Sequence, residues 1–189
     1  MKNIIATLAI YCIFGFGRDA VASSLPADSI YLIPPVMLEN QNGERMLLSS
    51  LAGKPRLIGM FYGSCKIVCP LEFETVKNVE QQLVKKGKKS VAVLLISFDG
   101  THDKGSHLLR VAQSHQMNLP LYQISRIEQG DVVLLGSVLG ISWRALPEGG
   151  FAHNALLTLV DSQGRIIAQQ SAQGGLDDKF LELLAKIED

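Results

Sequence analysis

The hydrophobic and polar positions of this chain change period along its length in a way that predicts a mixed α/β fold. Residues 57–62 and 91–98 are near-continuous apolar runs, which are typical of strands covered on both faces of a sheet. Between them, residues 70–86 place apolar side chains three or four positions apart, the spacing of one helix face. This strand–helix–strand order predicts two parallel strands joined by a helix.

The flanking segments extend the same architecture. Residues 36–38 and 46–47 are predicted to form a hairpin around Asn42-Gly43. Further elements are expected as helices at 104–117, 132–139 and 176–187, a short strand at 121–124, and a second hairpin of residues 156–160 and 165–170. The order predicts a thioredoxin-like α/β sandwich, in which helices flank a central mixed sheet that carries an N-terminal β-hairpin.

Asp103 and Asp131 each precede one of the predicted helices, and we expect both side chains to cap them. Asp99 lies at the carboxyl end of the strand predicted at 91–98, the edge where open α/β sheets place their sites. Two interpretations of Asp99 remain open. It either orients a ligand or contacts a partner, or it simply forms the turn after the strand.

Composition agrees with one folded domain. The chain has 189 residues, of which 47% are apolar and 19% charged, values that argue against intrinsic disorder. Lys and Arg number 18 and Asp and Glu number 18. This balance gives no electrostatic attraction to nucleic acid, so we expect no nucleic-acid partner.

The N-terminus has the pattern of an export signal. Lys2 precedes an apolar run over residues 4–16, and the small residues 20–22 form a cleavage pattern. The run is shorter than the ~20 residues that span a bilayer. We therefore predict a signal peptide or short anchor at 1–22, a linker at 23–35 and the domain at 36–189. The protein is expected in the periplasm, held at the inner membrane only if the signal is uncleaved.

Cys65 and Cys69 remain once Cys12 leaves with the signal. A disulfide between them would close a very small loop and constrain the unfolded chain little, so chemistry is favoured over a structural role. The pair lies where a predicted strand meets a helix, so both sulfurs project to one side and the helix N-terminus favours thiolate. C-x-x-x-C spacing eases capture of a soft ion such as copper(I) or zinc, whereas C-x-x-C indicates disulfide exchange.

His153 is the histidine placed to complete such a site. It follows a glycine-containing segment at 147–150 and precedes the strand predicted at 156–160. In a thioredoxin-like sheet this loop lies beside the cysteine helix, although a purely structural role for the imidazole is also compatible with the sequence. His102, His107 and His115 are interpreted as solvated surface residues.

Four segments together resemble the Sco (SenC) family. Residues 61–70 resemble its aromatic strand end followed by C-x-x-x-C-P, and residues 97–103 resemble its Asp-Pro-x-x-Asp segment, with Gly100 in place of the usual proline. Residues 151–154 and 161–165 resemble its histidine strand and hairpin. The matches occur in the family's order and cover about residues 30–170.

The resemblance implies a copper ion, Cu(I) or Cu(II), bound by Cys65, Cys69 and His153. It also implies a role in delivering copper to, or maintaining the thiols of, the copper centre of a respiratory oxidase. The expected partners are therefore an oxidase subunit that carries copper and an external thiol reductant. On this hypothesis the protein is a metallochaperone rather than an enzyme.

A second hypothesis makes the chain a thiol–disulfide oxidoreductase. Cys65 would attack a client disulfide and Cys69 would resolve the mixed disulfide. A peroxidase of related fold is a weaker alternative, because neither cysteine has a peroxide-site pattern around it.

Overall fold

The computed structural model describes residues 25–187 apart from residues 67, 118 and 120. The predicted signal at 1–22 lies outside the described residues. Within the described part, no helix combines the length and apolarity needed to cross a membrane.

One seven-stranded mixed sheet forms the centre of the domain, in the order β2-β1-β5-β4-β3-β8-β9. Its strands are β1 (Met37–Asn40), β2 (Arg45–Leu47), β3 (Arg56–Phe61), β4 (Ala92–Ser97), β5 (Tyr122–Gln129), β8 (Leu156–Val160) and β9 (Ile166–Ser171). β3, β4 and β5 run parallel, while β1 and β8 join this group antiparallel. The thioredoxin-like sandwich and its N-terminal hairpin are therefore confirmed.

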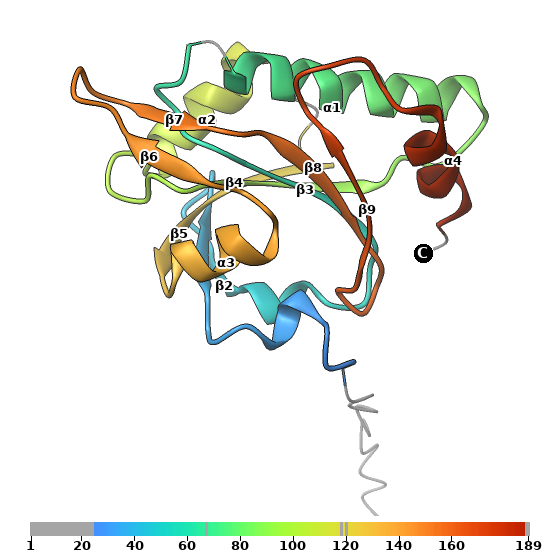
Figure 1. Ribbon diagram of the computed structural model, residues 1–189, viewed down its shortest axis with the longest axis horizontal. Helices are drawn as coiled ribbons and strands as arrows, with labels where there is room; N and C mark the ends of the chain where they lie inside the picture. The colour runs from blue at the N-terminus through green and yellow to red at the C-terminus, as the bar shows by residue number, and fades with distance from the viewer. Residues whose placement is uncertain (1–24, 67, 118, 120, 188–189) are drawn as a thin grey trace, which may run out of the picture.

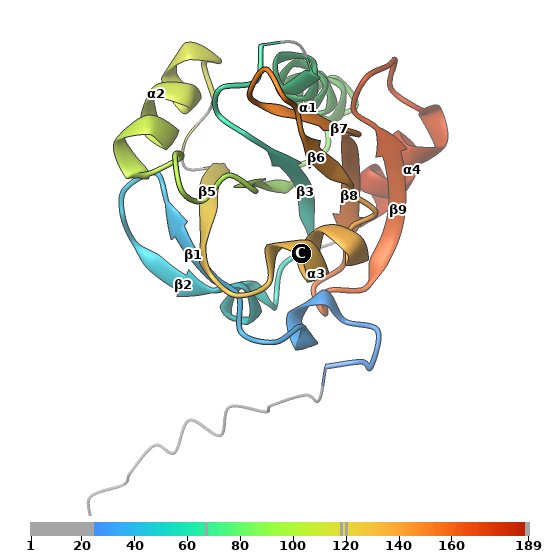
Figure 2. The same cartoon turned by 60° about the vertical axis from the view of Figure 1, so that its left-hand side comes forward.

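Helices cover the sheet, as Figures 1 and 2 show. They are α1 (Val68–Lys85), α2 (Gly105–Ser114), α3 (Val132–Val138) and α4 (Asp178–Lys186), with short 3-10 turns η1 (Ile30–Leu32) and η2 (Leu48–Leu51). α1 lies along one face of the sheet beside α4, and α3 lies on the other. Because both faces are covered, five of the six residues in β3 and in β4 are buried, which explains their apolar runs.

Several sequence expectations needed adjustment. α1 begins at Val68 rather than residue 70, so Cys69 lies inside the helix. β5 continues well beyond residue 124, to Gln129. In the segment expected to be a linker, Ser29 caps η1, and Ile30 and Tyr31 are buried in the core.

The two predicted aspartate caps have different outcomes. Asp131 accepts a hydrogen bond from the Leu134 backbone at 2.8 Å and caps α3 as expected. The prediction for Asp103 is wrong, because α2 begins after Lys104 with no side-chain cap. Asp103 is buried instead and bonds to groups on three other segments. Sequence spacing alone could not separate these two roles.

A second, two-stranded sheet was not predicted from the sequence. β6 (Trp143–Ala145) pairs with β7 (Phe151–His153), and Trp143 lies opposite His153 in the register. His153 was expected in a loop before a strand, but it occupies a strand of its own. The hairpin projects beyond the main sheet as an arm (Figure 1).

Gly59 occupies a position that has no room for a side chain. It lies in the middle of β3, and a Cβ there would overlap Oε1 of Glu72 and come within 3.1 Å of Leu95 Cδ2. Gly59→Ala should therefore lower the free energy of unfolding by about 1–3 kcal/mol, measured by urea denaturation.

Adding Glu72→Ala to Gly59→Ala should recover most of that loss, because the overlapping oxygen is gone. Gly174→Ala is the matched control, since a Cβ at Gly174 meets no atom within 4 Å. An equal loss in the single and the double variant would show that Glu72 does not set the space at Gly59.

Candidate metal centre

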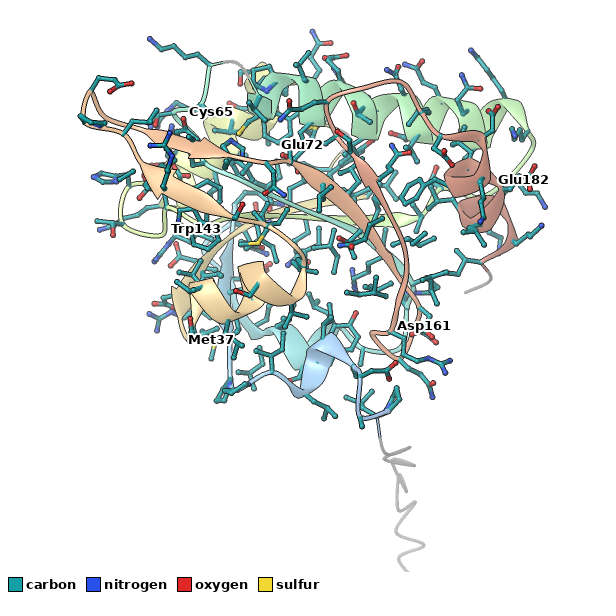
Figure 3. All side chains as sticks on the ribbon, in the orientation of Figure 1. Met37, Cys65, Glu72, Trp143, Asp161 and Glu182 are labelled. Carbon is teal, nitrogen blue, oxygen red and sulfur yellow. The ribbon has the colours of Figure 1, made fainter. Side chains whose placement is uncertain are left out.

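Cys65 and Cys69 lie where β3 passes into α1. Cys65 is partly exposed and Cys69 is 1% exposed, and no disulfide joins them. The turn is closed by a hydrogen bond from the Cys65 N–H to the Tyr62 carbonyl at 3.1 Å. The Cys69 N–H, in the first turn of α1, then donates to Cys65 Sγ at 3.3 Å. Figure 3 labels Cys65 at this end of the helix.

His153 reaches the two sulfurs from β7. Its Nε2 lies 3.8 Å from Cys65 Sγ and 3.8 Å from Cys69 Sγ. Its Nδ1 lies 2.9 Å from the Asn154 carbonyl oxygen. Because a carbonyl can only accept, Nδ1 carries the proton and the Nε2 lone pair faces the sulfurs, which is the tautomer a metal ligand requires.

Aromatic rings fix the position of the imidazole. Tyr62 and Phe98 meet the His153 ring edge-on, with centroids 5.5 and 5.4 Å away. Trp143 stacks on Phe98 at 4.9 Å, and the Tyr62 hydroxyl donates to the Phe151 carbonyl at 3.2 Å. These contacts attach the β6–β7 hairpin to the cysteine loop, so the histidine and the thiols belong to one packed unit.

The two thiols are electrostatically unequal. The hydrogen bond to Cys65 and then burial raise the pKa of the Cys69 thiol well above its usual range. Cys65 instead accepts a backbone N–H at a helix N-terminus, an arrangement that stabilises a thiolate. Without a bound cation the pair therefore holds a proton on Cys69, and a metal that binds both sulfurs must displace it.

The geometry fits one small cation. All three donor atoms lie within 4.8 Å of one another. Bonds of ~2.3 Å to sulfur and ~2.0 Å to imidazole nitrogen, at trigonal angles, put the two donors about 3.7 Å apart. The observed 3.8 Å sulfur–nitrogen distances thus need almost no rearrangement. No other trio of His, Cys, Asp or Glu side chains in the described residues comes this close together.

A family model for SCO1/SenC matches residues 28–123, more than half of the chain. The chain belongs to the SCO1/SenC family. A SCO1 protein homolog of Bacillus subtilis is 24% identical over 143 residues, which are 72% of each chain.

Solved structures agree with this membership at the level of fold. Arabidopsis thaliana ScoI, solved with copper bound, has a TM-score of 0.69 and 14% identity and covers 81% of this chain and 95% of its own. BsSco is described as a member of the Sco family of cytochrome c oxidase assembly proteins with a disulfide switch. It has a TM-score of 0.69 and 16% identity and covers 82% and 91%.

The remaining residues singled out from the sequence of this SCO1/SenC protein lie outside the trio. The Asp99 carboxylate pairs with His102 Nδ1 at 2.8 Å, so its role in orienting a ligand stays a prediction. The His102 side chain is 78% exposed, as expected. His107 and His115 are only partly exposed, so the expectation of solvated residues fails for them. His107 pairs with Asp103, and His115 packs on Phe73, where burial lowers the pKa of its imidazole.

Glu72 was not singled out from the sequence, and it is fully buried beneath α1 (Figure 3). Neither carboxylate oxygen has a hydrogen-bond partner among the described residues. Burial, and secondarily the charge of Cys65, raise the pKa of this carboxyl well above its usual value. The sequence did hold one indication of this burial. Glu72 lies one turn after Cys69, on the face of α1 that also carries Phe73 and Val76.

Proposed function

We propose that this chain is an exported copper-binding protein that carries one copper ion on Cys65, Cys69 and His153. Its task would be the assembly, or the thiol maintenance, of the copper centre of a respiratory oxidase. The single observation that supports the proposal most strongly is the placement of two sulfurs and one imidazole nitrogen around a point suited to one ion. Family membership and the copper-bound ScoI add to it.

The donor set explains the choice of metal. Thiolates are soft ligands that favour copper(I), and the imidazole also tolerates copper(II), so one site can hold either state. Two charged sulfurs and one nitrogen leave the ion open to a donor from a client protein. Copper would then pass to the client by stepwise exchange of ligands, as cargo rather than as a resident cofactor.

His153→Ala tests the trio. We expect one copper per reduced wild-type chain after dialysis, by elemental analysis. The variant should bind copper(I) about ten times more weakly in competition with a chromophoric chelator, because one of three ligands is lost. His102→Ala is the control, as that imidazole is exposed and pairs only with Asp99 among its described contacts. Equal copper affinity in wild type and His153→Ala would remove the histidine from the site.

A second function, thiol–disulfide exchange, is favoured by the unequal burial of the cysteines. Cys65 is accessible and would attack a client disulfide, releasing one client thiolate. Cys69 would lose its proton to solvent and attack the Cys65 sulfur, releasing the second client thiolate and leaving a Cys65–Cys69 disulfide. An external dithiol would then reduce that disulfide. Both functions require such a reductant in an oxidising compartment, and we propose it as a partner.

Location follows from the same proposal. A signal peptide or short anchor at residues 1–22 would place the metal centre in the periplasm. Mass spectrometry of the N-terminus of the exported protein tests this. A peptide that begins at residue 23 supports cleavage, and an intact residue 1 supports a tether.

A further inference from the structure

Asp103 joins three segments around the start of the cysteine loop. Its Oδ2 accepts the Gly63 N–H at 2.7 Å and the Ser97 hydroxyl at 2.5 Å. Its Oδ1 lies 2.8 Å from Nδ1 of His107 on α2. The carboxylate is 1% exposed, so these three donors, rather than water, satisfy it. It differs in this from Glu72, which is as deeply buried but accepts no hydrogen bond from any described residue.

The bond to Gly63 restrains the short segment that carries Cys65. Only residues 62–64 separate the end of β3 from Cys65. Tyr62 is fixed by its ring contacts and by the hydrogen bond from the Cys65 N–H to its carbonyl. Gly63 is fixed by Asp103. Without the hydrogen bond between Gly63 and Asp103, the backbone that leads into Cys65 could move. The Cys65 Sγ atom would then move with it.

Close packing around Gly63 strengthens this restraint. A Cβ at Gly63 would come within 2.6 Å of Asp103 Oδ1 and 2.8 Å of His107 Cε1. Any side chain there must push the carboxylate or the imidazole away. The contact between Asp103 and Gly63 can therefore be disrupted by a substitution of either residue.

We propose that Asp103 is a positioning residue for the metal centre, which holds the Gly63 peptide so that Cys65 meets Cys69 and His153 at bonding distance. The proposal rests on the proposed function, because it concerns the same two thiols. It gives the aspartate two residues before α2 a task in ligand geometry rather than in helix capping. Residues that orient a ligand in this way commonly change metal affinity by about 10–100-fold.

The test compares variants on the two sides of the contact. Asp103→Ala and Gly63→Ala should each weaken copper(I) affinity about tenfold, measured by chelator competition on the reduced protein. Asp103→Asn should stay within about threefold of wild type. Its amide oxygen still accepts from Gly63 and Ser97, while its NH2 can donate to a neutral His107.

Asp177→Ala is the matched control for stability. Asp177 caps α4 by accepting from the Phe180 N–H at 2.8 Å, far along the chain from the site. Its removal destabilises the fold without touching the cysteine loop, so wild-type affinity is expected. Thermal unfolding of each variant shows whether the loss of stability is comparable. If Asp103→Ala does not fold, the comparison of copper affinity between Gly63→Ala and Asp177→Ala decides the question by itself.

Wild-type copper affinity in Gly63→Ala and in folded Asp103→Ala would overturn the proposal, as would an equal loss in Asp177→Ala. If the wild type binds no copper, the proposed function fails separately. The equilibrium of the Cys65–Cys69 couple with glutathione then tests the positioning. A tenfold change in this equilibrium constant in Gly63→Ala, with no change in Asp177→Ala, supports the positioning role of Asp103. An unchanged constant in Gly63→Ala refutes that role.

Discussion

Replacing Cys69 with serine is expected to abolish copper retention, weakening affinity by about a hundredfold or more, or about 2.8 kcal/mol. A hydroxyl is a poor donor for a soft ion, so only Cys65 and His153 would remain as ligands. The lost sulfur is also the buried one, and no other described His, Cys, Asp or Glu side chain is close enough to complete the trio. Elemental analysis after dialysis and chelator competition measure the effect.

Cys65→Ser distinguishes the two proposed functions. In a metal carrier the two serine variants should be equivalent, because each removes one sulfur from the same ion. In a thiol–disulfide oxidoreductase they should differ. Cys69→Ser would leave the partly exposed Cys65 joined to its client as a mixed disulfide, whereas Cys65→Ser would form none. Full copper loading of both variants would contradict the three-ligand site.

Local periodicity made much of the fold predictable. The runs that became β3 and β4 are buried on both faces, and the apolar positions of α1 recur every three or four residues. The cysteine pair was recognisable for the same reason, since its spacing and its place after a strand are local features. The structure then brought His153 to the pair across more than 80 residues. Only the thioredoxin-like fold and the family resemblance could foresee that contact.

What the sequence could not show depends on contacts between distant segments. Asp103 has the spacing of a helix cap, but its carboxylate instead accepts hydrogen bonds from the Gly63 N–H and the Ser97 hydroxyl. The β6–β7 hairpin is too short for a periodic signal, and packing of Trp143 on Phe98 holds it. At Gly100, a Cβ would overlap the Ile127 carbonyl oxygen, a contact between segments far apart in the sequence. None of these facts has a local pattern.

The protonation of Glu72 affects the stability of the domain and depends on the charge of the nearby thiol. The space for its carboxyl exists because β3 has glycine at position 59, so the group is accommodated there without a hydrogen-bond partner among the described residues. A buried carboxyl is costly when charged, and the negative charge of Cys65 nearby makes the charged form of Glu72 less favourable still. The folded state therefore holds this carboxyl in its protonated form to a higher pH than the unfolded chain does.

Glu72→Gln should remove a pH dependence from the stability of the reduced, metal-free protein. Above pH 4.5, the ordinary value for this carboxyl, the unfolded chain releases its proton while the folded state retains it. The free energy of unfolding of the wild type then falls by about 1.4 kcal/mol per pH unit from this group alone. The stabilisation is complete below pH 4.5 and is lost as pH rises towards the folded-state pKa.

The variant has no proton to release, so its stability relative to wild type should increase with pH. The difference should grow by up to about 3 kcal/mol between pH 4.5 and 7, measured by urea denaturation across that range. The buried amide of the Glu72→Gln variant adds a cost in stability that does not change with pH. The test therefore rests on how the stability difference changes with pH, and not on its absolute value. Glu74→Gln, at an exposed position of the same helix, should leave the slope unchanged. Parallel stability curves for wild type and Glu72→Gln would mean that Glu72 ionises in the folded state as readily as in the unfolded chain.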